Sequence, residues 1–372
     1  MSSGRSRSTS VVALLADIPS TGHLGNARAQ RFSLDGDDLA TQTGEFLDFA
    51  FHHVNQGRKV VALYPRWRSG RAERAIRFAR GALRTDHIAA VPLDVSPLAL
   101  SLLADQLAYL APYLPSGLIA ELGDTLAAHV LAGGWLRSVA NLSTIPITVK
   151  QHMGSFAPGV VFLAFCAPVK RVGRVKKANP EQNIPFRPLN PTQILVSAGR
   201  DADRTAFEQQ FLPVIGATAV HEMPEQPLGP TYWGTTKYVE FVVFSAHQDA
   251  LTHPVRTLRS TACGWCRERV VSSYCRFCGA VNRTPARRPT AAPHAHMRPQ
   301  TPPPAPAGPR IPGPPPPTGP HLPGPGTGHH APIGPPTGPS PPVRPETTGR
   351  HPHSAPPTPP SPGSLPEYRP AR

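Results

Sequence analysis

The sequence predicts an α/β protein with a largely parallel or mixed sheet and flanking helices, followed by a small cysteine-rich module and a disordered proline-rich tail. Three apolar runs, at residues 11–18, 59–64 and 88–93, alternate with helical patterns in the first hundred residues. This alternation is typical of parallel strands connected by helices. We therefore expect four segments: an α/β portion over 1–150, a second β-rich α/β portion over 151–258 (in the same domain or a separate one), a metal-binding module over 259–284 and a tail over 285–372.

The helices of the first portion are marked by apolar stripes and by residues that start or end helices. Residues 37–55 carry such a stripe and end before Gly57, a residue type that often terminates helices. Ser96 and Pro97 suit a helix cap and a first helical position, and they precede a leucine-rich stretch that ends at Leu110.

The remaining elements of the body follow from shorter patterns. A further apolar stripe predicts a helix over 116–131, which Gly133 and Gly134 should end. Beyond residue 150, buried-strand patterns appear at 160–165, 193–197, 217–222 and 238–244, with a helix expected over 203–212.

Four cysteines carry the most specific signal in the chain. They form two C-x-x-C pairs eight residues apart, a spacing that suits one tetrahedral ion held by four thiolates. Zinc is the ion that favours such a sulfur shell. The predicted ligands are Cys263, Cys266, Cys275 and Cys278.

The second pair lies in the stretch Tyr274-Cys275-Arg276-Phe277-Cys278-Gly279. This stretch resembles one half of the short zinc ribbons that are common in prokaryotic proteins, and the resemblance covers residues 263–279 only. It implies a structural zinc with four closed ligands, and so no open position for catalysis. The sequence departs from the ribbon pattern at Arg267, where a glycine usually follows the first pair.

The tail and the overall charge narrow the function classes. Residues 285–372 contain 32 of the 50 prolines, so we expect a disordered segment that serves as a spacer or as a ligand for a protein partner. The net charge of +15 fits nucleic acid or an acidic protein surface as partner. No apolar run is long enough to span a bilayer, and four of the five cysteines suit a metal, which points to the reducing cytoplasm.

Two basic clusters are candidate contacts for phosphate groups. The first is an amphipathic helix with arginines spaced by three or four residues, and the second is a predicted loop after the strand at 160–165. Solvated surface arginines would explain the same patterns. The candidate nucleic-acid or phosphate ligands are Arg71, Arg74, Arg77, Arg80 and Arg84 in the helix, and Lys170, Arg171, Arg174, Lys176 and Lys177 in the loop.

A catalytic or cofactor site has weaker support. Asp17 and Asp94 end the first and third apolar runs, and ligands of open α/β sheets collect at the carboxyl ends of strands. The loop after Asp17 offers Ser20, Thr21, Gly22 and Gly25 as candidate cofactor-binding residues, although it matches no phosphate-binding motif.

These observations favour a non-enzymatic, nucleic-acid-associated or adaptor protein with a structural zinc ribbon. One alternative is an α/β enzyme that acts on a nucleotide or phosphorylated ligand at the strand carboxyl ends. The other is a scaffold that gathers partners through the tail. The sequence alone does not decide whether the chain is an enzyme.

Overall fold

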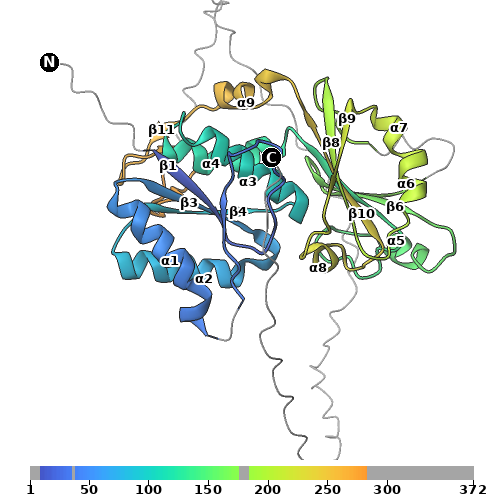
Figure 1. Ribbon diagram of the computed structural model, residues 1–372, viewed down its shortest axis with the longest axis horizontal. Helices are drawn as coiled ribbons and strands as arrows, with labels where there is room; N and C mark the ends of the chain where they lie inside the picture. The colour runs from blue at the N-terminus through green and yellow to red at the C-terminus, as the bar shows by residue number, and fades with distance from the viewer. Residues whose placement is uncertain (1–8, 36–37, 176–183, 283–372) are drawn as a thin grey trace, which may run out of the picture. The chain divides into compact units, whose positions relative to one another are not determined.

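A computed structural model describes residues 9–35, 38–175 and 184–282 of the chain (Figure 1). The predicted disordered tail over 285–372 lies outside the described residues, and so do Lys176 and Lys177. Within the described part, no helix is both long and apolar enough to cross a membrane.

The first sheet is parallel throughout and confirms the α/β prediction for the first hundred residues. Its order is β2-β1-β3-β4, and every neighbouring pair of strands runs in the same direction. The central strand β3 is buried along most of its length because helices cover both faces of the sheet. The strands are β1 (Ser10–Leu14), β2 (Gln30–Arg31), β3 (Lys59–Pro65) and β4 (Ile88–Leu93).

One face of this sheet is covered by α1 (Leu39–Asn55) and α2 (Ser69–Leu83), as Figure 1 shows. Asp38 caps α1 by accepting the amide of Thr41 at 2.8 Å, and Gly57 follows the helix at a φ of +72°. The turn η1 (Arg66–Arg68) joins β3 to α2. The expected helices in these two places are confirmed.

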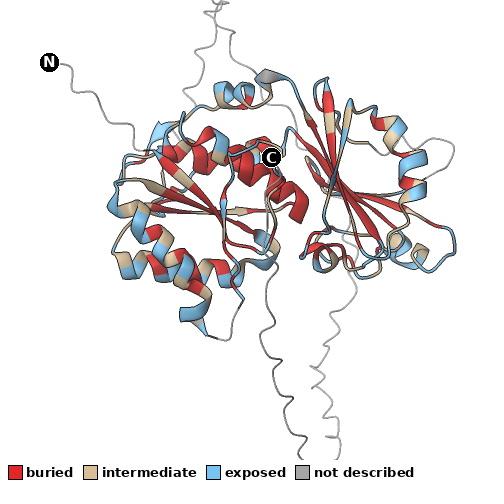
Figure 2. Cartoon of the chain, viewed as in Figure 1, coloured by how far each residue is buried: buried red, intermediate tan, exposed pale blue. Residues whose placement is uncertain are grey.

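The other face is covered by α3 (Pro97–Leu110) and α4 (Ser116–Ala127). Helix α3 is buried almost all round (Figure 2), because it lies between the first sheet and the second. Its leucines pack against both sheets in one continuous core. The N–H of Leu98 in its first turn donates to Glu240 of the second sheet at 2.8 Å.

The second sheet is mixed, with the order β7-β6-β5-β10-β8-β9, and only β8 and β9 run parallel. Strand β5 corrects one prediction. Gly133 and Gly134 lie inside this strand, whereas the sequence analysis expected them to end a helix. A Cβ on Gly133 would lie 2.5 Å from the Ala164 carbonyl oxygen, so this strand needs the glycine for close approach. The strands are β5 (Leu131–Leu136), β6 (Phe162–Ala167), β7 (Arg171–Arg174), β8 (Thr192–Ala198), β9 (Ala219–Met223) and β10 (Tyr238–Ser245).

Short helices complete the second portion. Phe207 and Phe211 pack on Phe241 of β10 with ring centroids 6.0 and 4.6 Å apart, which covers the face of the sheet opposite α3. The small elements are α5 (Val149–Gly154), α6 (Arg204–Gln210), α7 (Leu212–Ile215), α8 (Gly229–Trp233), η3 (Gln248–Ala250), α9 (Thr252–Thr257), β11 (Thr261–Ala262) and β12 (Arg269–Val270).

Candidate functional sites

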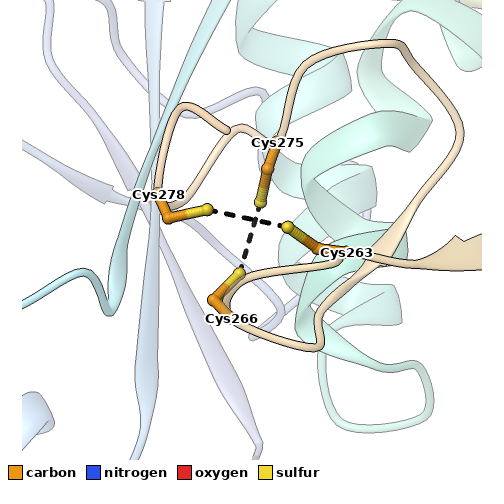
Figure 3. Close-up of side chains that lie close together, drawn as sticks. All are labelled: Cys263, Cys266, Cys275 and Cys278. Atoms are coloured by element: carbon orange, nitrogen blue, oxygen red, sulfur yellow. Dashed lines mark hydrogen bonds between the residues drawn. The ribbon is translucent and has the colours of Figure 1, made fainter. Parts of the chain in front are cut away.

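The four cysteines converge on one point (Figure 3). Their sulfur atoms all lie within 4.8 Å of one another, with Cys263 and Cys278 3.7 Å apart and Cys266 and Cys275 3.4 Å apart. This is the arrangement of a tetrahedral four-sulfur shell, and the group can hold a metal ion.

The two turns that present the sulfurs have the same backbone conformation. In each turn the residue after the second cysteine is left-handed, with φ values of +64° at Arg267 and +75° at Gly279. The N–H of each of these residues donates to the carbonyl of the first cysteine of its pair, at 3.2 and 2.9 Å. Arg267 therefore adopts a conformation that glycine tolerates better than any other residue.

The thiols of the cluster differ in how readily they ionise. Burial raises the pKa of the Cys266 and Cys275 thiols. Burial opposes ionisation of Cys263 as well, but the N–H groups of Cys266 and Trp265 outweigh it and lower the pKa of Cys263 to about 6. Four thiolates this close together need a positive ion between them.

The cysteine module, residues 259–282, is docked firmly on the first sheet and α4. The carboxylate of Glu268 pairs with Lys59 and accepts the amide of Gly117 at 2.8 Å. Arg276 pairs with Asp124 at 2.9 Å, and its carbonyl accepts the amide of Ala90 in the edge strand β4 at 3.1 Å.

The two candidate catalytic carboxylates lie in different surroundings. Asp17 is exposed and borders a small cavity of about 30 Å³ near Arg68 and Arg71. Asp94 lies beyond β4 and forms an ion pair with Lys170 at 2.8 Å.

The loop residues proposed for a cofactor surround a buried carboxylate instead. Asp105 on α3 is 1% exposed and accepts the hydroxyl of Ser20 at 2.8 Å and the amide of Thr21 at 3.1 Å. Gly22 and Gly25 shape the same loop, with φ values of +64° and +61°. The hydrogen bonds from Ser20 and Thr21 to Asp105 hold the loop after β1 in place, so these donors are engaged within the fold.

The arginines of α2 differ in what they contact. Arg71 pairs with Asp35 at 3.0 Å, and Arg80 donates to the Ile88 carbonyl at 2.6 Å and to the Arg276 carbonyl at 2.9 Å. Arg74, Arg77 and Arg84 are exposed. Arg80 thus serves to join α2, β4 and the cysteine module.

The second basic cluster is not the loop that we expected. Arg171 and Arg174 form the ends of strand β7 because this segment pairs with β6 as a hairpin. Lys170 donates to Asp94 and to the Thr144 carbonyl at 2.7 Å.

An apolar cavity of about 250 Å³, which the sequence did not reveal, lies between the α3–α4 pair and the segment that follows β10. Leu126, Val130 and Phe244 form its buried apolar wall. Imidazole rings stand around it, and His129 donates its Nδ1–H to the Thr125 carbonyl at 2.8 Å. The rings belong to His129, His247 and His253.

Inside this cavity, Gln106 is 6% exposed and its Oε1 has no hydrogen-bond partner among the described residues. The site therefore combines an apolar wall with a few polar groups, the usual composition of small-molecule sites. No local motif marks it, because its residues come from four separate stretches of the chain.

A second feature that the sequence did not reveal is a buried polar cluster where α3 meets β10. Burial raises the pKa of Glu240 to about 7, although the hydrogen bond from the Leu98 amide favours its ionised form. Ser96 Oγ, Tyr232 OH, Trp233 Nε1 and Glu240 Oε2 have no hydrogen-bond partner in the described structure.

No protein-family model matches the sequence, and no curated protein matches it either. Solved structures do resemble the chain. A DegV family protein from Corynebacterium glutamicum is 12% identical with a TM-score of 0.46, over 65% of this chain and 98% of its own. A stearic acid-binding protein from Eubacterium ventriosum is 14% identical with a TM-score of 0.45, and the match covers 64% of this chain and 98% of that protein. A fatty-acid-binding DegV family protein from Thermus thermophilus is 11% identical with a TM-score of 0.46, and the match covers 64% of this chain and 99% of that protein.

The expectation of a nucleic-acid-associated or adaptor protein, with nucleic acid or an acidic surface as partner, is wrong. One resembling structure is described as a stearic acid-binding protein, and another as a fatty-acid-binding DegV family protein. Two of the ten basic residues expected to bind phosphate, Arg80 and Lys170, are engaged in contacts within the fold.

Proposed function

We propose that this chain binds a lipid-like molecule, with an apolar body and one acidic head group, in the cavity between α3, α4 and the segment after β10. The main support for this proposal is that the cavity has an apolar wall with polar groups around it. Removing an apolar chain from water supplies most of the binding free energy, at about 25 cal/mol per Å². A fatty acid has this chemistry, and it is the ligand named for two of the resembling structures.

The polar groups of the cavity suit the head group. The Nδ1–H of His129 is already donated to a carbonyl, so its Nε2 is the atom left for a ligand. His247 Nδ1 accepts the amide of Asp249 at 3.1 Å, which places the ring proton of a neutral imidazole on Nε2 as a donor. A carboxylic acid can donate its O–H to Nε2 of His129 and accept the Nε2–H of His247.

Binding of saturated carboxylic acids of increasing length to delipidated protein tests this function by calorimetry. We expect affinity to rise with chain length until the cavity is full. Ala250 lines the cavity, so Ala250→Trp should fill it and weaken binding at least about tenfold, or 1.4 kcal/mol. Ala82→Trp, at an exposed position on α2, is the matched control and should bind like the unaltered chain. Equal affinity of both variants would exclude this cavity as the site.

We further propose that the four-cysteine group holds zinc in a structural role, as in a short zinc ribbon. Four sulfur ligands suit zinc and leave no open position for a reacting water. Thiolate ligands persist in a reducing compartment, which supports the cytoplasm as the site of action. Metal analysis of protein purified without chelator tests the assignment, since an intact chain without zinc would contradict it. The division of the chain at residues 150, 258 and 284 stays a prediction.

A further inference from the structure

The edge of the first sheet beside β1 is incomplete. Strand β2 pairs only with Ala13 and Leu14, whereas β3 pairs with β1 from Ser10 onward. Residues 10–12 of β1 therefore have no strand opposite them on that side within the described chain. An open strand edge presents backbone groups that can pair with another chain.

The backbone direction shows which groups face this open edge. The carbonyl of Thr9 accepts the amide of Lys59, and the amide of Leu15 donates to the Leu63 carbonyl, so odd-numbered residues of β1 bond to β3. Even-numbered residues face the opposite side, as the bond from the Phe32 amide to the Leu14 carbonyl confirms. The amides of Ser10 and Val12 consequently point to the edge that β2 does not cover.

A groove of about 470 Å³ runs along this open edge. Val11, Phe49 and Pro112 supply apolar surface, and the Ser10 side chain, only 6% exposed, has a hydroxyl without a partner. The groove is lined by Thr9, Ser10, Val11, Val12, Arg28, Gln30, Phe49, Arg58, Ala108, Ala111 and Pro112.

Two arginines give the groove a positive rim. Arg28 and Arg58 both line it, and neither is within ion-pair distance of a carboxylate in the described residues. Arg28 donates only its Nε–H to the Gly25 carbonyl at 3.0 Å, which leaves its terminal nitrogens for a ligand. Unpaired guanidinium groups beside free strand amides suit a carboxylate attached to an extended backbone.

We propose that this groove binds the C-terminal end of an extended peptide, which adds a strand beside β1 in line with β2. The peptide backbone pairs with Ser10 and Val12, alternate side chains lie on the apolar surface, and the terminal carboxylate contacts Arg28 or Arg58. The site lies at the amino end of β1 and shares no lining residue with the apolar cavity.

An acetylated hexapeptide of alternating threonine and valine, with a free C-terminal carboxylate, serves as the probe for the full chain. We expect binding to slow amide hydrogen exchange at Ser10 and Val12. Methylation of the peptide nitrogens that face β1 should abolish binding because it removes the strand hydrogen bonds. Amidation of the C-terminus should weaken binding about tenfold because it removes the charge-assisted contact.

Arg58→Gln and Arg28→Gln locate the carboxylate. We expect at least one of them to weaken binding about tenfold, while Arg77→Gln, an exposed arginine on α2 with a 70% exposed side chain, leaves it unchanged. The inference is overturned if the hexapeptide does not bind at millimolar concentration, if the methylated peptide binds equally well, or if neither groove arginine matters.

Discussion

Replacing Glu240 by glutamine should remove a pH-dependent loss of stability. The carboxyl group is fully buried, and burial raises its pKa to about 7 from an ordinary value of 4.5. Below pH 4.5 the group is protonated in both the folded and the unfolded chain, so its titration does not lower the free energy of unfolding. As the pH rises from 4.5 to 7 the unfolded chain releases this proton and the folded chain keeps it, so the free energy of unfolding falls.

The expected size follows from the difference of about 2.5 pKa units, at 1.36 kcal/mol per unit, which is about 3 kcal/mol above pH 7. Glutamine keeps an oxygen to accept the Leu98 amide and never ionises. The variant should therefore be about 1 kcal/mol more stable than the unaltered chain near pH 5 and about 3 kcal/mol more stable near pH 8. Tyr232 and Cys166 do not obscure the effect, because burial keeps the pKa of both well above this range.

Urea unfolding of both chains at several pH values between 5 and 8.5 gives the measurement. Any pH effect on the cysteine group is common to both chains and cancels in the difference. Glu45→Gln, which removes an exposed carboxylate on α1, is the control and should show no pH-dependent difference. If the stability difference between Glu240→Gln and the unaltered chain is the same at pH 5 and pH 8, the carboxyl group is not buried in the way described.

Three further changes probe the cysteine module and the loop after β1. Arg267→Gly should raise the free energy of unfolding by about 1 kcal/mol, because it relieves a left-handed conformation at φ +64°, and an unchanged melting temperature would argue against that conformation. Cys275→Ser should lose the bound metal and also destabilise β4, because the Arg276 carbonyl accepts the amide of Ala90. Hydrogen exchange at Ala90 measures this, and unaltered protection would show that the module is separable. Asp105→Ala should lower the free energy of unfolding by about 3 kcal/mol or more, because it leaves the Arg31 guanidinium without its carboxylate partner. Urea unfolding measures this change, and a decrease under about 1 kcal/mol would mean that the loop after β1 does not depend on this carboxylate.

The local pattern of the sequence was enough to predict the cysteine group and three strands of the first sheet, β1, β3 and β4, but it missed the two-residue strand β2. The runs at β3 and β4 are apolar because both faces of a parallel sheet are covered, and that burial leaves a continuous signature in the sequence. The cysteine spacing is equally local, since each pair is presented by one tight turn. Gly133 and Gly134 misled the prediction because glycine breaks helices but also permits the close strand contacts found in β5.

The sites depended on contacts between distant segments, which only the tertiary structure decides. Lys170 and Asp94 are 76 residues apart in sequence, so no spacing shows that they neutralise each other. The apolar cavity combines Gln106 of α3 with Phe244 of β10, two residues that look like ordinary helix and strand positions when taken alone. Composition determined that this chain has a core and many cations, whereas packing determined which cations are used within the fold and where a space for a ligand remains. The physical reason is that burial and charge pairing depend on distance in space, and the sequence specifies only distance along the chain.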